Sequence, residues 1–398
     1  MFKIDVRRKV DFMRTLYEAI AERLKRVDFN EIWTGFHPFE FALYNSQHIA
    51  LSNCDLPWNE KFVGNTAIQY EGKYIAIWNI EDYHNTKIDP DELAADLVHE
   101  MFHAYQMTLG ETRFPDDLLM LHYPQEIQNC LEKYEENTDI VKALREENSV
   151  LRQQYLCNFC ERRKKREQRI GNIIKQEYLS ETLEGMAEYA GLTALQMLDL
   201  QKYQSRVKRY TDYLESLDLR QLDWRRMSYY SGACVIILVK ELGWSIAHTI
   251  GKEEKSVFEI ICERRHGCKK SAGNTGVMTD IEKELSLFRT VGGCIHDSDL
   301  TEPERIEAMK QLLEQLKDEQ RQIIKKFQEK ELHKITGEFR ICGYDPMNVF
   351  YIDGFLYCST FMAISDDDYK NEKRLFGESL MELIPSTYNK VSCYSYIK

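Results

Sequence analysis

The chain has 398 residues, a formal net charge of −12 and 43% hydrophobic residues. This length suits one large domain or two to three smaller ones. The negative charge argues against nucleic acid and against an anionic membrane as partners, because both bind clustered Lys and Arg. No apolar run reaches the roughly 18 residues of a membrane span, and we expect no signal peptide. Eleven cysteines without framework spacing indicate reduced thiols and a cytoplasmic protein.

The first 88 residues predict one helix and a small antiparallel sheet. Apolar side chains recur at helical spacing over residues 3–27. Short runs rich in β-branched and aromatic residues then predict strands over 39–44, 48–52, 63–70 and 74–80. We expect this sheet to form one unit with the helix that follows it.

A clearly delimited helix is predicted from Pro90 to Leu109. Asp89 is a suitable N-cap, and Glu92 completes a capping box. Gly110 is a natural stop for the helix. The sequence HEMFH lies in the middle of this helix and not in a loop.

Residues 89–300 are predicted to form a mainly helical part. The strongly charged segment 125–178 indicates a helical hairpin, inserted before a second helix over about 180–200. A further helix is predicted over 229–242, where an apolar run ends at Gly243.

Two patterns within the hairpin are interpreted as structural. The basic run 161–169 is typical of a solvated face or a hairpin tip in an acidic protein. Cys157 and Cys160 are not followed by a second pair at zinc-knuckle spacing, so we interpret them as ordinary thiols.

The C-terminal third combines a helix with strands. A long amphipathic helix is predicted over 301–335, with Thr301 and Glu304 as its capping box. The segment 336–398 returns to strand patterns, and Asp353-Gly354 between two apolar runs indicates a hairpin turn. The whole chain therefore predicts an α+β fold with an N-terminal sheet, a mainly helical core and a C-terminal β segment.

The HEMFH sequence indicates a metal site. His99 and His103 stand four residues apart, so both imidazoles lie on one face of the helix, one turn apart. This spacing suits two ligands of a tetrahedral Zn²⁺ site. Glu100 lies about 100° further around the helix, from where we expect it to reach a water in the open coordination position.

A catalytic zinc ion needs a third protein ligand. The segment ETLEGMAEY, residues 181–189, offers three glutamates on a predicted helix. Glu184 and Glu188 share one face, and Glu181 is a rival for the ligand role. A carboxylate that accepts the distal N–H of His99 would also fix the tautomer of that histidine.

At these two segments the chain resembles a known family. HEMFHAYQ followed by LEGMAEYAG resembles the gluzincin zinc metallopeptidases, the group that includes thermolysin-like endopeptidases and zinc aminopeptidases. The resemblance implies that Glu184 is the third zinc ligand. It also implies that Glu188 holds a ligand histidine from behind.

A third segment extends the resemblance. YYSGACVIILVKELG, residues 229–243, resembles the Y-x-x-G start of a helix in zinc aminopeptidases and related enzymes. This match implies that the hydroxyl of Tyr229 helps to hold the oxyanion. Tyr230 and His248 are alternatives for the same role.

The chain also departs from this family. Eighty residues separate His103 from Glu184, which is more than in those enzymes and is consistent with an inserted hairpin. The G-x-M-E-N-like strand of aminopeptidases is absent, since GNTAIQY at 64–70 lacks the glutamate.

Together these features predict a zinc-dependent metallopeptidase, a hydrolase whose substrate is a peptide or protein. Glu100 is expected to act as general base, and the substrate is expected to add as a strand along the edge of the 63–80 hairpin. The alternative is a gluzincin scaffold that binds or regulates, with zinc but little turnover. Hydrolysis of a non-peptide amide is a third hypothesis.

Overall fold

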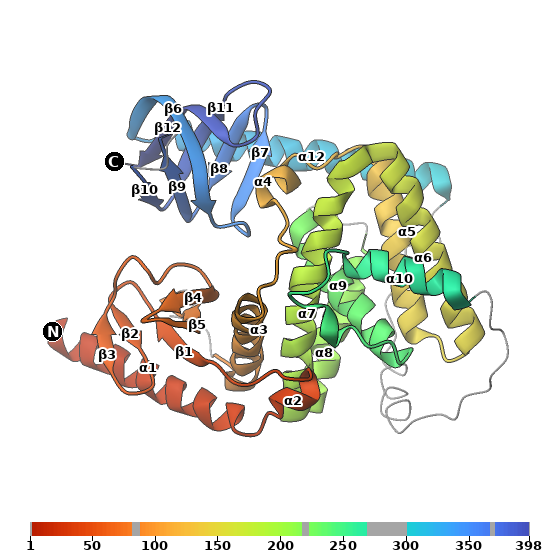
Figure 1. The fold of residues 1–398 in the computed structure, drawn as a ribbon. Helices are drawn as coiled ribbons and strands as arrows, with labels where there is room; N and C mark the ends of the chain where they lie inside the picture. Colours follow the sequence, from red (N-terminus) through yellow and green to blue (C-terminus); the bar gives the residue numbers. More distant parts are fainter. Residues whose placement is uncertain (1, 82–87, 217–222, 269–300, 367–370, 398) are drawn as a thin grey trace.

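The structure is a computed structural model that describes residues 2–81, 88–216, 223–268, 301–366 and 371–397. It confirms the predicted α+β class. The chain forms a five-stranded sheet, then a group of helices and then a seven-stranded antiparallel sheet. In Figure 1 the two sheets lie on the left, the first below the second, and most of the helices lie to their right. Residues 217–222 and 269–300 of the predicted helical part lie outside the described residues. No described helix is long and apolar enough to cross a membrane.

The N-terminal part consists of two helices and a mixed sheet. The elements are α1 (Phe2–Leu24), α2 (Phe29–Ile32), β1 (Glu40–Tyr44), β2 (His48–Ala50), β3 (Asp55–Pro57), β4 (Thr66–Tyr70) and β5 (Lys73–Asn79). The sheet order is β3-β2-β1-β5-β4, which leaves β4 at one edge. One pairing differs from the predicted antiparallel arrangement, because β1 and β5 run parallel. Apolar alternation defines the face of a strand but not its direction.

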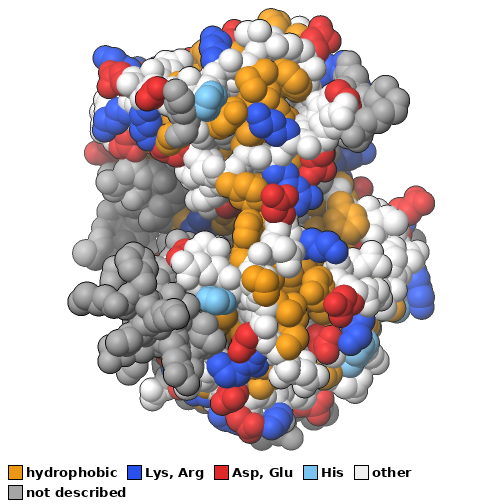
Figure 2. All heavy atoms as spheres, turned by 90° about the vertical axis from the view of Figure 1, so that its left-hand side faces the viewer, with side chains coloured by type: hydrophobic (Ala, Val, Ile, Leu, Met, Phe, Trp, Pro, Cys, Tyr) orange, Lys and Arg blue, Asp and Glu red, His pale blue; other side chains and the backbone are white. Residues whose placement is uncertain are grey.

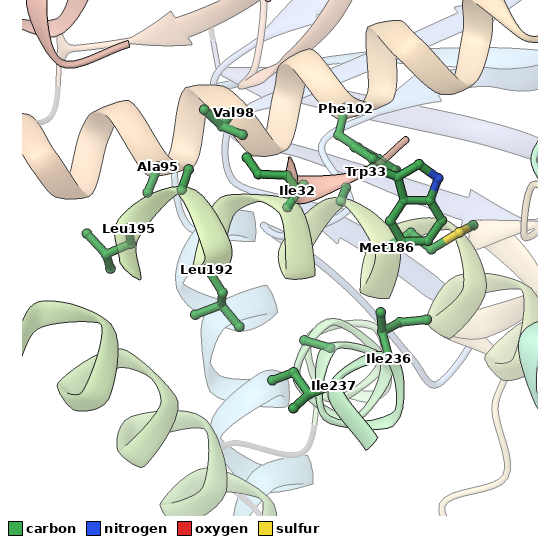
Figure 3. Close-up of a cluster of buried hydrophobic side chains, with 14 of the residues drawn as sticks. Ile32, Trp33, Ala95, Val98, Phe102, Met186, Leu192, Leu195, Ile236 and Ile237 are labelled. Carbon is green, nitrogen blue, oxygen red and sulfur yellow. The ribbon is translucent and has the colours of Figure 1, made fainter. Parts of the chain in front are cut away.

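Three helices form the centre of the molecule: α3 (Pro90–Thr108), α7 (Ile174–Leu198) and α9 (Trp224–Glu241). Helix α7 lies between the other two (Figure 3). Val98 and Phe102 of α3 pack on one side of it, and Ile236 and Ile237 of α9 pack on the other. Because α7 is covered on several sides, most of its residues are buried, including polar ones.

Two helices begin earlier than predicted. Helix α7 begins at Ile174 and not near residue 180, so Ser180 is a buried residue inside the helix. Helix α9 begins at Trp224 and is capped by Asp223, which places Tyr229 in the second turn and not at the start.

The helical part also contains shorter elements: α4 (Asp117–Leu121), α8 (Leu200–Leu214), α10 (Val257–Cys268) and the 3₁₀ turns η2 (Gly171–Ile173) and η4 (Ala247–Thr249).

The segment 125–178 contains two long helices that lie side by side, α5 (Ile127–Arg145) and α6 (Ser149–Ile170) (Figure 1). The interpretation of the basic run 161–169 as a solvated face is wrong for two of its residues. Arg163 and Arg166 are fully buried, because they face α5 and α7 and not the solvent.

These two arginines belong to a buried ion cluster that joins the hairpin to α7. We define the hairpin ion cluster as the following residues: Lys133, Glu136, Arg163, Arg166, Glu177 and Glu181. Arg163 and Arg166 both bind Glu177, with N–O distances of 3.3 and 2.9 Å. Three acidic and three basic groups balance one another, as buried charges must.

The C-terminal part is one helix and an antiparallel sheet. The elements are α12 (Glu302–Gln328), β6 (Leu332–Tyr344), β7 (Val349–Ile352), β8 (Phe355–Cys358), β9 (Phe361–Ser365), β10 (Lys373–Phe376), β11 (Ser379–Leu383) and β12 (Lys390–Ile397). The predicted capping box of Thr301 and Glu304 is confirmed. The predicted end of this helix at residue 335 is wrong, because β6 already begins at Leu332. Asp353 and Gly354 have positive φ angles of 50° and 87° between β7 and β8, which confirms the hairpin turn.

The two sheets touch on one side of the molecule. The ring of Trp58, after β3, meets the ring of Phe376 of β10 edge-on at 5.9 Å between centroids. Arg374 Nη1 donates to the carbonyl oxygen of Glu60 at 2.7 Å. Figure 2 shows hydrophobic side chains running in a band from the upper to the lower part of this face.

Glycines allow α7 and α9 to approach closely. A Cβ atom on Gly185 would lie 2.6 Å from Gly232 Cα, and one on Gly232 would lie 2.6 Å from the carbonyl oxygen of Glu181. Both distances are too short for real Cβ contacts, so neither position accepts a side chain without moving a helix.

We therefore predict that Gly185→Ala or Gly232→Ala lowers the free energy of unfolding by about 1–3 kcal/mol, the usual cost of overpacking. Gly343→Ala is the matched control, because its Cβ would meet Ala363 at an ordinary 3.4 Å. Chemical denaturation of the three variants measures the difference. Equal stability of all three would contradict the close helix contact.

Candidate metal centre

Helix α3 presents the HEMFH sequence towards α7. The Asp89 side chain caps the helix by accepting from the N–H groups of Asp91 and Glu92. The other half of the predicted capping box differs, because the Glu92 carboxylate pairs with Arg206 of α8. The cap and this ion pair fix the start of the helix that carries the histidines.

Three potential ligand atoms converge between α3 and α7. His99 Nε2 lies 3.0 Å from His103 Nε2. Glu184 Oε2 lies 3.0 Å from His103 Nε2 and 3.5 Å from His99 Nε2. Tetrahedral zinc with ligands at about 2.05 Å would separate its ligand atoms by about 3.3 Å. The three atoms are thus already spaced as ligands of one small cation.

Glu100 lies beside this triangle. Ligand atoms of His99, Glu100 and His103 lie within 4.8 Å of one another, so a metal could also be drawn between these three. The shorter separations to Glu184 favour Glu184 as the third ligand. Glu100 is then a buried carboxylate, 7% exposed, next to the ligands.

Both histidines are held from behind. Glu188 Oε2 lies 2.9 Å from His99 Nδ1, and Tyr210 of α8 donates to the other oxygen of Glu188. His103 Nδ1 lies 2.8 Å from Gln106 Oε1. These contacts leave Nε2 of each ring directed at Glu184, which is the tautomer that a metal site requires.

Helix α9 completes the site from the third side. Arg225 Nη2 donates to Glu184 Oε1 at 2.9 Å, and its Nε donates to Asp117 of α4 at 3.2 Å. The Tyr229 ring stacks on the His99 ring at 5.7 Å with an angle of 5°. The Arg225 guanidinium in turn lies 5.5 Å from the Tyr229 ring centre.

The alternatives from the sequence lie elsewhere. Glu181 belongs to the hairpin ion cluster, where Lys133 and Arg163 bind it. The Tyr230 ring stacks on the Tyr210 ring of α8, with 4.1 Å between the ring centroids. His248 is an exposed residue of the η4 turn.

The charges at the site act on one another. Burial raises the pKa of the Glu184 carboxyl, but His103 and Arg225 outweigh this effect and hold it well below its usual range. Burial lowers the pKa of His99, yet its contacts with Glu184 and Glu188 raise it overall. Burial raises the pKa of Glu100. The site therefore favours positive charge between Glu184 and the histidines.

Sequence patterns missed four residues of this site: Gln106, Asp117, Tyr210 and Arg225. Gln106 lies three positions after His103, and helical spacing alone could have placed it beside that ring. Arg225 lies four positions before Tyr229, but the predicted helix began too late to include it. Tyr210 lies on α8, a helix that was not predicted.

Comparison of the chain with protein-family models, with curated proteins and with solved structures finds no match.

The first prediction for this site separates the two candidate ligands. Glu184→Gln should weaken zinc binding by at least about tenfold, because the amide has no charge to offer the cation. Glu181→Gln should keep the zinc affinity and lower the stability, because it unbalances the hairpin ion cluster. Zinc titration against a competing chelator and chemical denaturation measure the two effects. The reverse pattern would make Glu181 the ligand.

The second prediction concerns the support of His99. Tyr210→Phe should weaken zinc affinity by about 10- to 100-fold, since it removes the hydrogen bond that orients Glu188. Tyr230→Phe is the matched control, because that ring stacks on Tyr210 without holding Glu188. The same chelator competition tests both variants, and equal affinities would show that Tyr210 only fills space.

Proposed function

We propose that the protein is a zinc-dependent metallopeptidase. The observation that carries this proposal is the triangle of His99 Nε2, His103 Nε2 and Glu184 Oε2, with separations of 3.0 to 3.5 Å. Two imidazoles and one carboxylate are a typical protein ligand set of a catalytic zinc ion, which keeps a fourth position open.

The surrounding charges fit a divalent cation. Glu100, Glu184 and Glu188 are all buried within one small region. The Arg225 guanidinium is shared between Glu184 and Asp117. Its single positive charge therefore does not neutralise the other carboxylates around the candidate ligands. A buried excess of negative charge is costly unless a cation offsets it. When bound, zinc would supply Lewis acidity that lowers the pKa of a water and polarises a carbonyl group.

Glu100 is the proposed carrier of the proton in this reaction. It follows His99 directly, and its carboxylate lies within 4.8 Å of the ligand atoms of both histidines. Its carboxylate would accept the proton of the attacking water and return it to the leaving amine, as a general base and then a general acid. Burial keeps bulk water from competing for this proton.

Tyr229 is the proposed donor to the developing oxyanion. Its ring stacks on His99, whereas the neighbouring Tyr230 packs on α8. Of the two tyrosines, Tyr229 is therefore the one beside the candidate ligands. A fixed hydroxyl donor at this point would stabilise the charge that forms when the carbonyl is attacked.

The edge strand β4 is the proposed place for a peptide or protein substrate. β4 is the last strand of the N-terminal sheet and packs near α3. An extended peptide could add to this edge by main-chain hydrogen bonds. The nine cysteines whose side chains the structure describes form no disulfide, which supports a cytoplasmic enzyme.

A binding or regulatory protein with zinc but little turnover is the second candidate. The contact of Trp58 with Phe376 favours it, because the two sheets meet on one side of the molecule and could restrict entry. A purely structural zinc would not need Glu100. The effect of a Glu100 substitution on peptide hydrolysis therefore distinguishes the two functions.

We predict that Glu100→Gln retains one zinc per chain and lowers kcat for peptide hydrolysis by about 10²- to 10⁴-fold, the usual contribution of a general base. Glu338→Gln, at an exposed position of β6, is the matched control and should not change kcat. Metal analysis and a peptide cleavage assay provide the two readouts. Wild-type protein that binds zinc but cleaves no peptide would favour the binding protein.

Tyr229→Phe should lower kcat by about 10²- to 10³-fold with little change in KM, because the hydroxyl acts on the oxyanion and not on the bound substrate. Tyr230→Phe should retain the wild-type kcat. Steady-state kinetics on one cleaved peptide tests both. A loss confined to Tyr230→Phe would move the role to the neighbouring residue.

A further inference from the structure

A second polar pocket lies directly behind Arg225. It is a cavity of about 180 Å³ between α4, α9, α12 and the β6–β7 end of the C-terminal sheet. Arg225 belongs to both places, because its Nη2 binds Glu184 while its side chain lines the cavity. The cavity is smaller than the roughly 300–1,000 Å³ of small-molecule sites, which suits it to one side chain.

Three residues that line this pocket have buried donors without a partner in the described part of the chain. They are Trp224 Nε1, Arg225 Nη1 and Tyr344 Oη. Buried polar groups are nearly always hydrogen-bonded in folded proteins. Three such groups around one cavity therefore indicate that an oxygen acceptor from a ligand belongs there.

The charge of the residues around the pocket argues against an acidic ligand. Asp223 lines the cavity but pairs with Arg226. Arg225 pairs with both Asp117 and Glu184, so two carboxylates already share the one guanidinium. A carboxylate ligand would meet this negative excess, and a cationic ligand would leave the buried donors unpaired. A neutral group satisfies both conditions.

The apolar walls and the free acceptor atoms of the pocket indicate which neutral group it would bind. Leu121, Val349 and Phe350 give the pocket an apolar surface, which suits the methylene groups of a side chain. Asp117 uses Oδ1 for Arg225 Nε and can accept a hydrogen bond from a ligand N–H. A primary amide offers the oxygen that the donors require and the N–H that Asp117 can accept.

We propose that this pocket is a specificity subsite for a glutamine or asparagine side chain of the peptide substrate, held by Arg225, Tyr344 and Asp117. The inference rests on the proposed metallopeptidase function. The C-terminal sheet would then form part of the substrate site, since Tyr344 ends β6.

Cleavage of a mixed peptide library by the full-length zinc-loaded protein tests the subsite, with the cut sites located by mass spectrometry. At one position near the cut, glutamine or asparagine should be enriched about 10- to 100-fold over methionine and glutamate. A methionine side chain would leave the buried donors unpaired, and a glutamate side chain would bring an unpaired charge into the pocket. Cleavage without such a preference would overturn the subsite and leave the metallopeptidase intact.

Tyr344→Phe tests whether the hydroxyl serves the substrate or the fold. Since Tyr344 Oη has no partner in the described part of the chain, its loss should leave the thermal stability unchanged and reduce the preference for glutamine over methionine about tenfold. Tyr396→Phe removes a hydroxyl from the same sheet that accepts from Lys373 and should keep the preference. An unchanged preference in Tyr344→Phe would contradict the proposal.

A binding measurement separates the subsite from turnover. Saturation-transfer NMR on the full-length protein should detect N-acetyl-glutamine methylamide and not N-acetyl-methionine methylamide, and Tyr344→Phe should lose the signal. If the library shows no cleavage at all, the metallopeptidase proposal fails. The NMR measurement alone then decides whether the pocket binds an amide side chain. Equal signals from the two amides would overturn it.

Discussion

Four buried glutamates on α7 are the constraint on which the structure around the site depends. Glu177, Glu181, Glu184 and Glu188 are at most 8% exposed and recur at spacings of four and three, which keeps them on one side of the helix. A buried carboxylate without a partner is strongly destabilising. The helices around α7 therefore each supply a partner: the hairpin supplies Lys133 and Arg163, α3 the histidines, α8 Tyr210 and α9 Arg225.

The two halves of α7 solve this constraint differently. In the hairpin ion cluster, three carboxylates meet three bases, and the charges balance within the protein. Around Glu184 and Glu188 the partners are the two histidines, Tyr210 and Arg225, which Glu184 shares with Asp117, and Glu100 adds a further acid. The first half is complete without a ligand, whereas the second half suits a bound cation. The hairpin thus supports the site from behind, because it holds the helix that carries Glu184.

The sequence predicted what depends on local spacing and missed what depends on tertiary contacts. The α+β class, the helix with His99 and His103 and the Asp353-Gly354 turn follow from short-range patterns, and the structure contains them. The parallel pairing of β1 with β5 was missed, because alternation does not encode strand direction. The burial of Arg163 and Arg166 was missed as well, because a basic run in a charged segment is usually solvated. Arg225 could be recognised only after α9 was seen to begin at Trp224 and to face Glu184.

The most direct measurement of the central claim is zinc K-edge X-ray absorption on the full-length protein loaded with one equivalent of zinc. If His99, His103 and Glu184 hold the ion, the first shell contains only nitrogen and oxygen at about 2.0–2.1 Å, with imidazole scattering from two histidines. Glu184→Gln should change this shell, and Glu181→Gln should not. Sulfur at about 2.3 Å in the first shell, or a protein that retains no zinc, would contradict the account.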